Sequence, residues 1–411
     1  MKTKGTKSKI FNDPVHGFIT ISHPLLFDVI EHPYFQRLRR IKQLGLTDYV
    51  YPGALHTRFH HAIGAYHLMR KALHTLKLKG VDITEKEELG ACGAILLHDI
   101  GHGPFSHTLE HVLIPKFSHE QISKVFIEEL NTFFKGRLDT AIAIFEGIYP
   151  KKFLHQLVSS QLDTDRLDYI SRDSFYTGVS EGTIAYDRII EMMNVRNNEL
   201  VVEEKGIYSV ENFLIARRLM YWQVYLHKTV LSVEQMLIKA VDRAKILVKE
   251  GKKVPSTDAL QYFLENDVSL KEFKTGEAIK WFAMLDDNDI FTTLKHWQSH
   301  SDPLLSILSK GILERKLFKV QMSEKPFSKA EVSEILSSIS KKFNIDKKTA
   351  MQFIINESTK NHAYNPNDKP IRMLSKSEKL IDVAKAADLL NISVLSKPVI
   401  KYFMCYPKFS N

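Results

Sequence analysis

Cysteine is scarce in this chain: only Cys92 and Cys405 occur among 411 residues, and they lie far apart in the sequence. Two distant thiols form neither a disulfide framework nor a CxxC metal motif, which excludes small disulfide-bonded scaffolds. Runs of about 18 apolar residues, the length that spans a bilayer, are also lacking. The basic N-terminal residues 1–9 contain no apolar stretch of the kind that a secretory signal needs. We therefore expect a cytoplasmic protein with no membrane span.

Low-complexity tracts and internal repeats are lacking too, and nothing suggests disorder on a large scale. Hydrophobic residues make up 44% of the chain and charged residues 26%, as in ordinary globular proteins. The length suffices for roughly two to three domains, or for one large domain with an appendage. A net charge of +9 favours anionic partners such as nucleotides, phosphorylated ligands or nucleic acid, although the basic residues are scattered in short clusters.

The spacing of apolar residues predicts a mainly α-helical protein, because apolar positions recur at intervals of three and four over long stretches. Shorter segments have turn residues and alternating patterns that are typical of strands. In chain order we expect strand and turn structure at 11–21, helices from Pro24 to about 195, a hairpin of strands 199–203 and 207–210 turning at Lys205-Gly206, and helices from Glu211 to about 315.

The last hundred residues have a different pattern, with short apolar runs that are typical of strands. We expect a core with a helical extension at 1–315 and a small α+β appendage at 316–411. Within the appendage the sequence predicts strands at 318–321, 371–374 and 402–406, a helix at 328–344, and a loop at 355–370, which is rich in Asn, Lys and Pro.

Histidine is concentrated in one region: ten of the 18 histidines fall within residues 56–119, where a uniform distribution would place about three. The apolar run 89–97 predicts a buried helix, and it ends in His98-Asp99. Burying an ionised carboxylate costs several kcal/mol unless a partner pairs with it. A metal ion is one such partner; an arginine paired with Asp99, with His98 as a satisfied core residue, is the alternative.

Further imidazoles and carboxylates lie upstream at 56–61 and downstream at 163–173. Asp165 and Tyr169 are four residues apart, so one helix face can present both. A site built from imidazoles and carboxylates, without thiolates, suits Mn²⁺, Fe²⁺, Ni²⁺, Zn²⁺ or Mg²⁺.

These segments, in this order, resemble the HD-domain phosphohydrolases, and more closely their deoxynucleoside triphosphate triphosphohydrolase branch of SAM-and-HD-domain enzymes. The resemblance covers roughly residues 10–235, and no SAM module is expected. It implies an HD-domain helical core and metal-dependent hydrolysis of deoxynucleoside triphosphates to nucleoside and triphosphate. The matching runs are 11–17, 36–45, 52–61, 98–107, 118–121, 165–173 and 225–228.

By this resemblance the metal ligands are His61, His98, Asp99 and Asp165, with Asp163 and Asp168 as rival carboxylates. The implied catalytic group is His102, His107, Glu110 and His119; members of the family usually carry Asp where this chain has Glu110. The implied substrate-binding residues are Gln43, Leu44, Arg58, Arg166, Tyr169, Asp173, Arg217 and Tyr225, with Arg166 in place of the usual Lys and Arg218 as a second choice for Arg217.

The family is also regulated by nucleotides bound between subunits. The resemblance therefore implies a nucleotide activator and a homo-oligomer, either a dimer or a tetramer. The corresponding positions are Lys9, Asn12, Gln36, Arg39, His227 and Lys228, while Glu31 departs from the family pattern and leaves the identity of the activator open.

Two other functions stay open. The HD fold also hosts nucleotidases and phosphodiesterases, and a fold does not fix a function. The basic charge also permits a nucleotide sensor or nucleic-acid-binding protein with little turnover, whose nucleic-acid affinity would fall steeply with salt.

Overall fold

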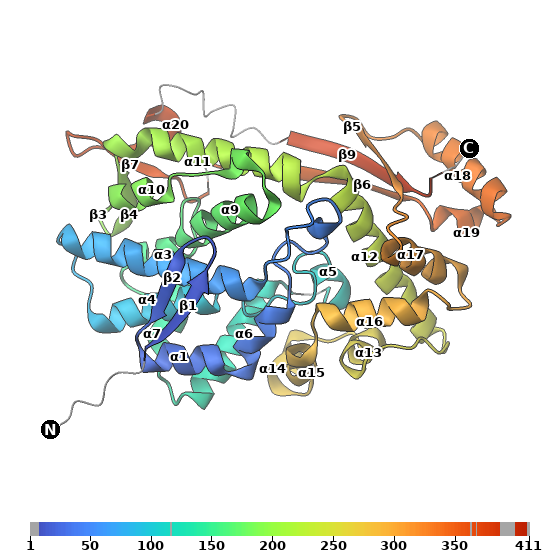
Figure 1. Cartoon of the computed structure of the whole chain (residues 1–411), viewed down its shortest axis with the longest axis horizontal. Coiled ribbons are helices and arrows are strands. Elements are labelled where there is room, and N and C mark those ends of the chain that lie inside the picture. The colour runs from blue at the N-terminus through green and yellow to red at the C-terminus, as the bar shows by residue number, and fades with distance from the viewer. Residues whose placement is uncertain (1–7, 116, 362–363, 367, 387–398, 409–411) are drawn as a thin grey trace.

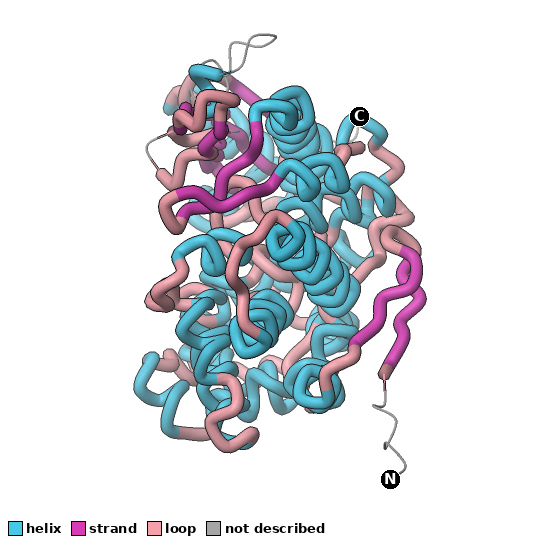
Figure 2. Tube along the Cα trace, turned by 90° about the vertical axis from the view of Figure 1, so that its left-hand side faces the viewer, coloured by secondary structure: helices cyan, strands magenta, loops and turns pink. Residues whose placement is uncertain are grey.

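Helices form most of the molecule, as expected, and the strands lie at its periphery (Figures 1 and 2). The computed structural model describes residues 8–115, 117–361, 364–366, 368–386 and 399–408. Among these residues the strands form three sheets of two, four and three strands. The fold is therefore a helical core with a small α+β appendage, which confirms the prediction.

The helices of the first half are α1 (Pro24–Glu31), α2 (Pro33–Gln36), α3 (Arg58–Leu78), α4 (Glu85–Leu97), α5 (Glu110–Leu113), α6 (His119–Phe133), α7 (Asp139–Phe145), α8 (Lys152–Val158), α9 (Thr164–Thr177) and α10 (Tyr186–Met192). Those that follow are α11 (Ile207–Met220), α12 (Lys228–Lys249), α13 (Asp258–Glu265), α14 (Leu270–Thr275), α15 (Ala278–Met284), α16 (Asp287–Trp297), α17 (Pro303–Leu313), α18 (Lys329–Phe343), α19 (Lys347–Met351) and α20 (Val383–Ala386).

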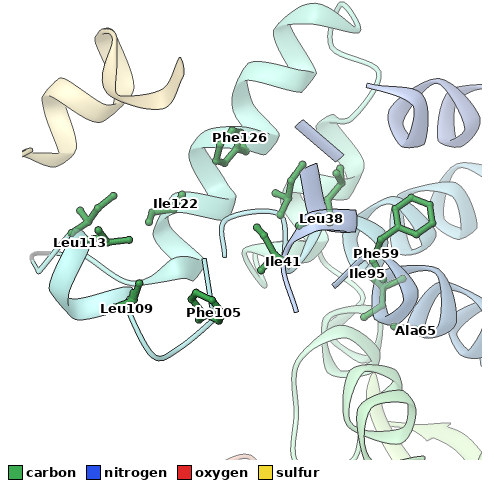
Figure 3. Close-up of a cluster of buried hydrophobic side chains, with 14 of the residues drawn as sticks. Leu38, Ile41, Phe59, Ala65, Ile95, Phe105, Leu109, Leu113, Ile122 and Phe126 are labelled. Atoms are coloured by element: carbon green, nitrogen blue, oxygen red, sulfur yellow. The ribbon is translucent and has the colours of Figure 1, made fainter. Parts of the chain in front are cut away.

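The centre of the core is helix α3, which packs against α4 and α9. Helix α4 begins with a capping box in which Thr84 and Glu87 satisfy each other's backbone N–H groups. From Gly90 to Leu97 the helix is buried all round, which confirms the predicted buried helix, and it ends at His98. Apolar side chains from several helices fill the space between them (Figure 3). The His98-Asp99 pair is therefore held at the end of a rigid, buried element.

A π-helical turn, Tyr221–Tyr225, joins α11 to α12. Such turns are rare and recur at functional sites, because the extra residue changes the direction of the side chains. Here the turn brings Tyr225 beside α9, where its hydroxyl donates to Asp173.

The predicted hairpin of 199–203 with 207–210 is wrong in its second strand and its turn: only the strand at 199–203 is present, and it pairs with the segment before it. Strand β4 (Glu199–Glu203) pairs with β3 (Met193–Arg196), and 207–210 belongs to α11. The turn lies at Asn197-Asn198, whose positive φ values of 52° and 63° suit a two-residue hairpin loop of asparagines. Val210, Phe213 and Leu214 are buried at helical spacing, so the apolar residues after Gly206 mark a helix face rather than a strand.

The C-terminal strands are β5 (Lys319–Ser323), β6 (Ile355–Asn361), β7 (Arg372–Leu374), β8 (Leu380–Asp382) and β9 (Val399–Tyr406). They confirm the strands predicted near 318–321, 371–374 and 402–406, and α18 confirms the helix. The loop predicted at 355–370 was wrong at its start, because β6 pairs along its length with β9. Pairing with a neighbouring strand overrides the weak strand preference of Asn and Lys; residues 362–363 and 367 lie outside the described part.

The sheets connect both parts of the chain. β7 pairs in parallel with β4 and antiparallel with β8, so one sheet contains strands from before and after residue 316. At the other end of the chain, β1 (Lys9–Asp13) and β2 (Gly17–Ile21) form a separate hairpin.

Among the described residues, no helix combines the length and the apolar character needed to cross a lipid bilayer.

Candidate functional site

The four residues expected to bind a metal come together from three helices. His61 lies in the first turns of α3, His98 and Asp99 follow α4, and Asp165 lies in the first turn of α9. His61 Nε2 is 3.3 Å from His98 Nε2 and 3.0 Å from Asp165 Oδ1. His98 Nε2 is 3.3 Å from Asp99 Oδ1 and 3.4 Å from Asp165 Oδ1.

These separations fit a metal site. Metal–ligand bonds of about 2.1 Å place neighbouring ligand atoms about 3 Å apart. The opposite nitrogen of each ring already has a partner: His98 Nδ1 is 2.6 Å from the carbonyl of Ile95, and His61 Nδ1 is 2.8 Å from Asp168. The Ile95 carbonyl and the Asp168 carboxylate can only accept hydrogen bonds, so Nδ1 of each ring carries the hydrogen. The Nε2 atoms of both rings are then left to face one point. A cation between them satisfies this arrangement.

The electrostatics also favour positive charge at this point. Although burial opposes charging of His61, Asp165 and Asp168 raise its pKa to about 10. Against the effect of burial, His98 and Arg58 hold the pKa of Asp99 well below its usual range. The pKa of Asp165 is lowered by His61 and His98, again against burial. Asp99 and Asp165 are therefore ionised at neutral pH and could serve as metal ligands.

The rival carboxylates lie outside the cluster. Asp163 is the N-cap of α9 and accepts the backbone N–H of Arg166 at 2.7 Å. Asp168 lies behind the His61 ring and is fully buried; it also accepts from Arg172 and contacts His16 Nε2 at 2.7 Å. Gly64 leaves room for this network, since a Cβ there would lie 2.1 Å from Asp168 Oδ1.

The four residues expected to be catalytic form one group beside the cluster. Glu110 accepts from His107 Nδ1 at 3.0 Å and from His119 Nδ1 at 2.8 Å. The rings of His102 and His119 stack with centroids 3.9 Å apart, and His102 Nε2 is 3.5 Å from Asp99 Oδ1. The two imidazoles hold the pKa of Glu110 below its usual range against burial, so it is an ionised acceptor. Glu110 stands where the family usually has Asp, and its longer side chain still reaches both histidines.

One cavity of about 570 Å³ connects these groups with the expected substrate-binding residues. This volume lies in the range of small-molecule sites, about 300–1,000 Å³. Of the residues expected to bind substrate, Gln43, Leu44, Arg58, Arg166, Tyr169, Asp173 and Tyr225 line it, together with Asp99, His102, His107, His119 and Asp165. Arg217 is not among the described lining residues, but its guanidinium acts on the pKa of the nearby Tyr169.

The arginines of the cavity are held by carboxylates. The Arg58 guanidinium contacts Asp99 through one nitrogen and donates from Nε to Ser106 Oγ at 2.8 Å. Arg166 pairs with Asp163 and lies 3.8 Å from Asp165 Oδ2. Both cations are thus fixed near the cluster, where anionic oxygen atoms of a ligand would meet them.

Several residues of the site were missed by sequence reasoning. His16 contacts Asp168 behind the His61 ring, and His56 Nε2 contacts Asp173 Oδ1 at 2.8 Å, while Tyr225 binds the other oxygen of that carboxylate. Glu234 of α12 faces the cavity and accepts from Thr108 Oγ1 at 3.1 Å; burial raises its pKa to about 7. The histidine enrichment was a signal for His56, but an ordinary helix pattern hides Glu234.

The six residues expected to bind an activator fall into two groups. In the first group, Lys9 pairs with Glu31. Gln36 accepts a hydrogen bond from Arg39 at 2.9 Å, and the guanidinium of Arg39 lies over the Phe59 ring. Asn12 lies on β1. His227 caps α12, and Lys228 lines a separate cavity of about 340 Å³ with Arg315, Lys319 and Lys408. β1 and α12 lie apart in Figure 1, and one chain does not bring the two groups together.

Comparison with known proteins gives one matching family model and three relatives. A family model described as HD associated region matches residues 184–262. The crystal structure of a phosphohydrolase from Bacteroides thetaiotaomicron is 50% identical, with a TM-score of 0.94, and the match covers 98% of this chain and 100% of that one. The uncharacterized protein YwfO of Bacillus subtilis is 31% identical over 98% of this chain and 93% of its own length.

A third relative carries a named activity. Human deoxynucleoside triphosphate triphosphohydrolase SAMHD1 is 32% identical over 302 residues, which is 61% of this chain and 48% of that protein. The chain thus spans about half the length of that relative.

Proposed function

The chain belongs to the HD-domain phosphohydrolases, and we propose that it hydrolyses deoxynucleoside triphosphates to nucleoside and triphosphate. The observation that carries this proposal is one cavity that is lined both by Asp99 and Asp165 of the candidate metal cluster and by Gln43, Tyr169, Asp173 and Tyr225. A nucleotide in this cavity reaches the cluster with its phosphates and the tyrosines with its nucleoside. The activity named for the SAMHD1 relative supports the same substrate class.

The cluster would hold one divalent cation, with Mn²⁺, Fe²⁺, Ni²⁺, Zn²⁺ and Mg²⁺ as candidates. When bound, such a cation supplies Lewis acidity at the phosphorus that is attacked. The protein's own contribution is to aim the four ligand atoms, since Asp168 and the Ile95 carbonyl fix the two imidazole rings.

The imidazoles beside the cluster are the proton donors in this proposal. Glu110 accepts from Nδ1 of His107 and of His119 and so keeps a hydrogen on that nitrogen of each ring. A protonated ring can then give its Nε2 proton to the 5′-oxygen of the leaving nucleoside. Burial and Arg58 lower the pKa of His102 well below its usual range, so His102 stays neutral and stacks beneath His119.

The nucleoside end of the cavity is shaped by Tyr225 and Asp173. The Tyr225 hydroxyl donates to Asp173 Oδ2 at 2.8 Å, and burial raises the pKa of Tyr225 well above its usual range. A neutral, hydrogen-bonded tyrosine forms a fixed wall beside the sugar. We expect this wall to exclude a 2′-hydroxyl, which would be buried there without a partner.

The two groups of activator residues fit an assembly of several chains. Because one chain keeps the Lys9 group apart from the Lys228 group, an activating nucleotide would contact the first group on one subunit and the second on its neighbour. The cations around Lys228 suit the phosphates of that nucleotide. The proposed assembly is a homodimer or homotetramer.

The test is product analysis. Purified protein is incubated with each dNTP and NTP in Mn²⁺ or Mg²⁺, alone and with GTP or dGTP, and the products are separated by ion exchange. We expect nucleoside and triphosphate in equal amounts, and neither product from Asp165→Ala. Monophosphate or single phosphate as the product would assign the chain to a different HD hydrolase, and no turnover in a metal-loaded protein would favour a sensor.

A further inference from the structure

Two loops line the proposed active site, and both are held by one residue of a helix that is distant in the sequence. The first loop carries Gln43 and Leu44, and the second carries His102 and His107. Asp287, the first residue of α16, accepts the backbone N–H of Lys42 at 2.9 Å and that of Phe105 at 2.7 Å. Its two carboxylate oxygens therefore each hold one loop.

A second residue of α16 contacts the same two positions. Phe291 follows Asp287 by four residues, so both lie on one face of the helix. The ring of Phe291 packs edge-on against Phe105 with centroids 5.4 Å apart, and Lys42 Nζ lies 5.5 Å from its centroid. One helix face thus contacts the backbone and the side chain of both Lys42 and Phe105.

The second loop needs an external restraint. Phe105 and Ser106 both adopt the left-handed region, with φ values of 54° and 55°, although neither is glycine. Each such residue costs on the order of 1 kcal/mol and persists only where its surroundings hold it. The Phe105 ring is buried with Leu109 and Ile41 in the core (Figure 3), and its N–H is bound by Asp287. The strained turn directly precedes His107.

The loops are also joined to each other through the same turn. Ser106 Oγ donates to the Lys42 carbonyl at 2.8 Å and accepts from Arg58 Nε at 2.8 Å. Loss of the Asp287 contacts would therefore change the position of Gln43, of His107 and of Arg58 relative to one another. A misplacement of about 1 Å between reacting groups can cost about 100-fold in rate.

We infer that Asp287 is a positioning residue that sets the distance between the Gln43–Leu44 loop and the His102–His107 loop. It touches neither substrate nor the metal cluster and acts through the two backbone N–H groups. The inference rests on the proposed function where turnover is measured, but the position of the loops can be tested without turnover.

Asp286 provides a matched control. It is the neighbouring residue in the chain, is the N-cap of the same helix, and is equally buried at 5% exposure. Its side chain caps α16 and contacts Arg40, and it binds neither loop. Asp286→Asn keeps an N-capping side chain, so it reports what a loss of charge at the start of α16 does by itself.

The experiment compares Asp287→Asn, Asp287→Ala and Asp286→Asn by hydrogen exchange, metal content and steady-state kinetics with a dNTP. We expect exchange in segments 42–47 and 103–110 to rise about tenfold or more in both Asp287 variants, most in Asp287→Ala. Metal content should stay at the wild-type level, while kcat falls about 10–100-fold. Asp286→Asn should match the wild type in exchange and in kcat.

Two outcomes would overturn the inference: wild-type exchange of either segment in Asp287→Ala, or equal effects of Asp286→Asn and Asp287→Asn. If the Asp287 variants do not fold, Phe291→Leu removes the ring contacts and keeps the carboxylate. It should raise exchange in the same two segments alone, and a uniform rise would count against the inference. A wild-type protein that hydrolyses no dNTP would overturn the proposed function, while exchange still decides the role of Asp287.

Discussion

His61 and Asp168 form a buried pair in which Nδ1 of the ring lies 2.8 Å from Oδ2 of the carboxylate, while Nε2 of the same ring faces Asp165. Asp168 also accepts from Arg172, which in turn pairs with Asp13 at 2.8 Å. The orientation of His61 is thus fixed by a network that reaches back to β1. We therefore expect Asp168 to influence metal binding through the orientation of His61, a candidate ligand.

Replacing Asp168 with Asn should weaken metal binding about 10–100-fold, because carboxylate partners of metal-bound histidines typically contribute that much. The measurement is metal affinity by competition with a chelator, together with a melting curve to show that the variant folds. Asp187→Asn is the control, since Asp187 pairs with Lys71 on the surface. Unchanged affinity in a folded Asp168→Asn variant would contradict the account.

Replacing Glu110 with Gln should lower kcat about 10²–10⁴-fold, the usual contribution of general acid–base catalysis. An amide has one acceptor oxygen and no charge, so it cannot hold both His107 and His119 as the carboxylate does. Metal content should not change, because the hydrogen bonds of Glu110 go to His107 and His119 and not to the four candidate ligands. Glu128→Gln, on the exposed face of α6, is the control. If Glu110→Gln has the same kcat as Glu128→Gln, the proposed role of Glu110 is excluded.

The raised pKa of Glu234 predicts that the free energy of unfolding depends on pH. Its folded pKa, raised by burial to about 7, exceeds the ordinary value of 4.5, so folding favours the protonated carboxyl. The stabilisation is complete below about pH 4.5 and is lost as the pH rises to about 7. Relative to Glu234→Gln, the free energy of unfolding of the wild type should therefore fall by up to about 3 kcal/mol between pH 4.5 and 8. Denaturant titrations of both proteins at several pH values test this; a constant difference would contradict it.

Replacing Tyr225 with Ala should reduce the preference for deoxynucleotides over ribonucleotides, because the wall beside the sugar is removed. We expect the ratio of kcat/KM values for dATP and ATP to fall at least about tenfold, which corresponds to about 1.4 kcal/mol. Tyr225→Phe keeps the ring and loses only the bond to Asp173, so it should keep most of the preference. If Tyr225→Ala keeps the wild-type preference for dATP over ATP, the sugar does not bind beside Tyr225.

The sequence was sufficient for the helical core and for the elements that carry the candidate ligands. The apolar run before His98 marks a buried helix, and helix α4 ends where that run ends. Local signals failed where tertiary pairing decided the structure. Strand β6 forms because β9 lies beside it, and the hairpin turns at Asn197-Asn198 because two asparagines accept the left-handed region.

The candidate site could be assembled only partly from the sequence. His61, His98, Asp99 and Asp165 lie in motifs, so their meeting in space was expected. Contacts across long stretches of chain leave no such local signal: Asp287 is 182 residues from Phe105, and Glu234 is 126 residues from Thr108. Both acids lie on helices with ordinary amphipathic patterns, where a carboxylate is expected to face solvent.

The central claim is hydrolysis at the α-phosphorus, and hydrolysis in ¹⁸O-labelled water tests it most directly. Mass spectrometry of the products should find one ¹⁸O atom in the triphosphate and none in the nucleoside, because water attacks the α-phosphorus and the 5′-oxygen leaves with the sugar. Label in the nucleoside, in pyrophosphate or in single phosphate would contradict the account and move the attack to another atom.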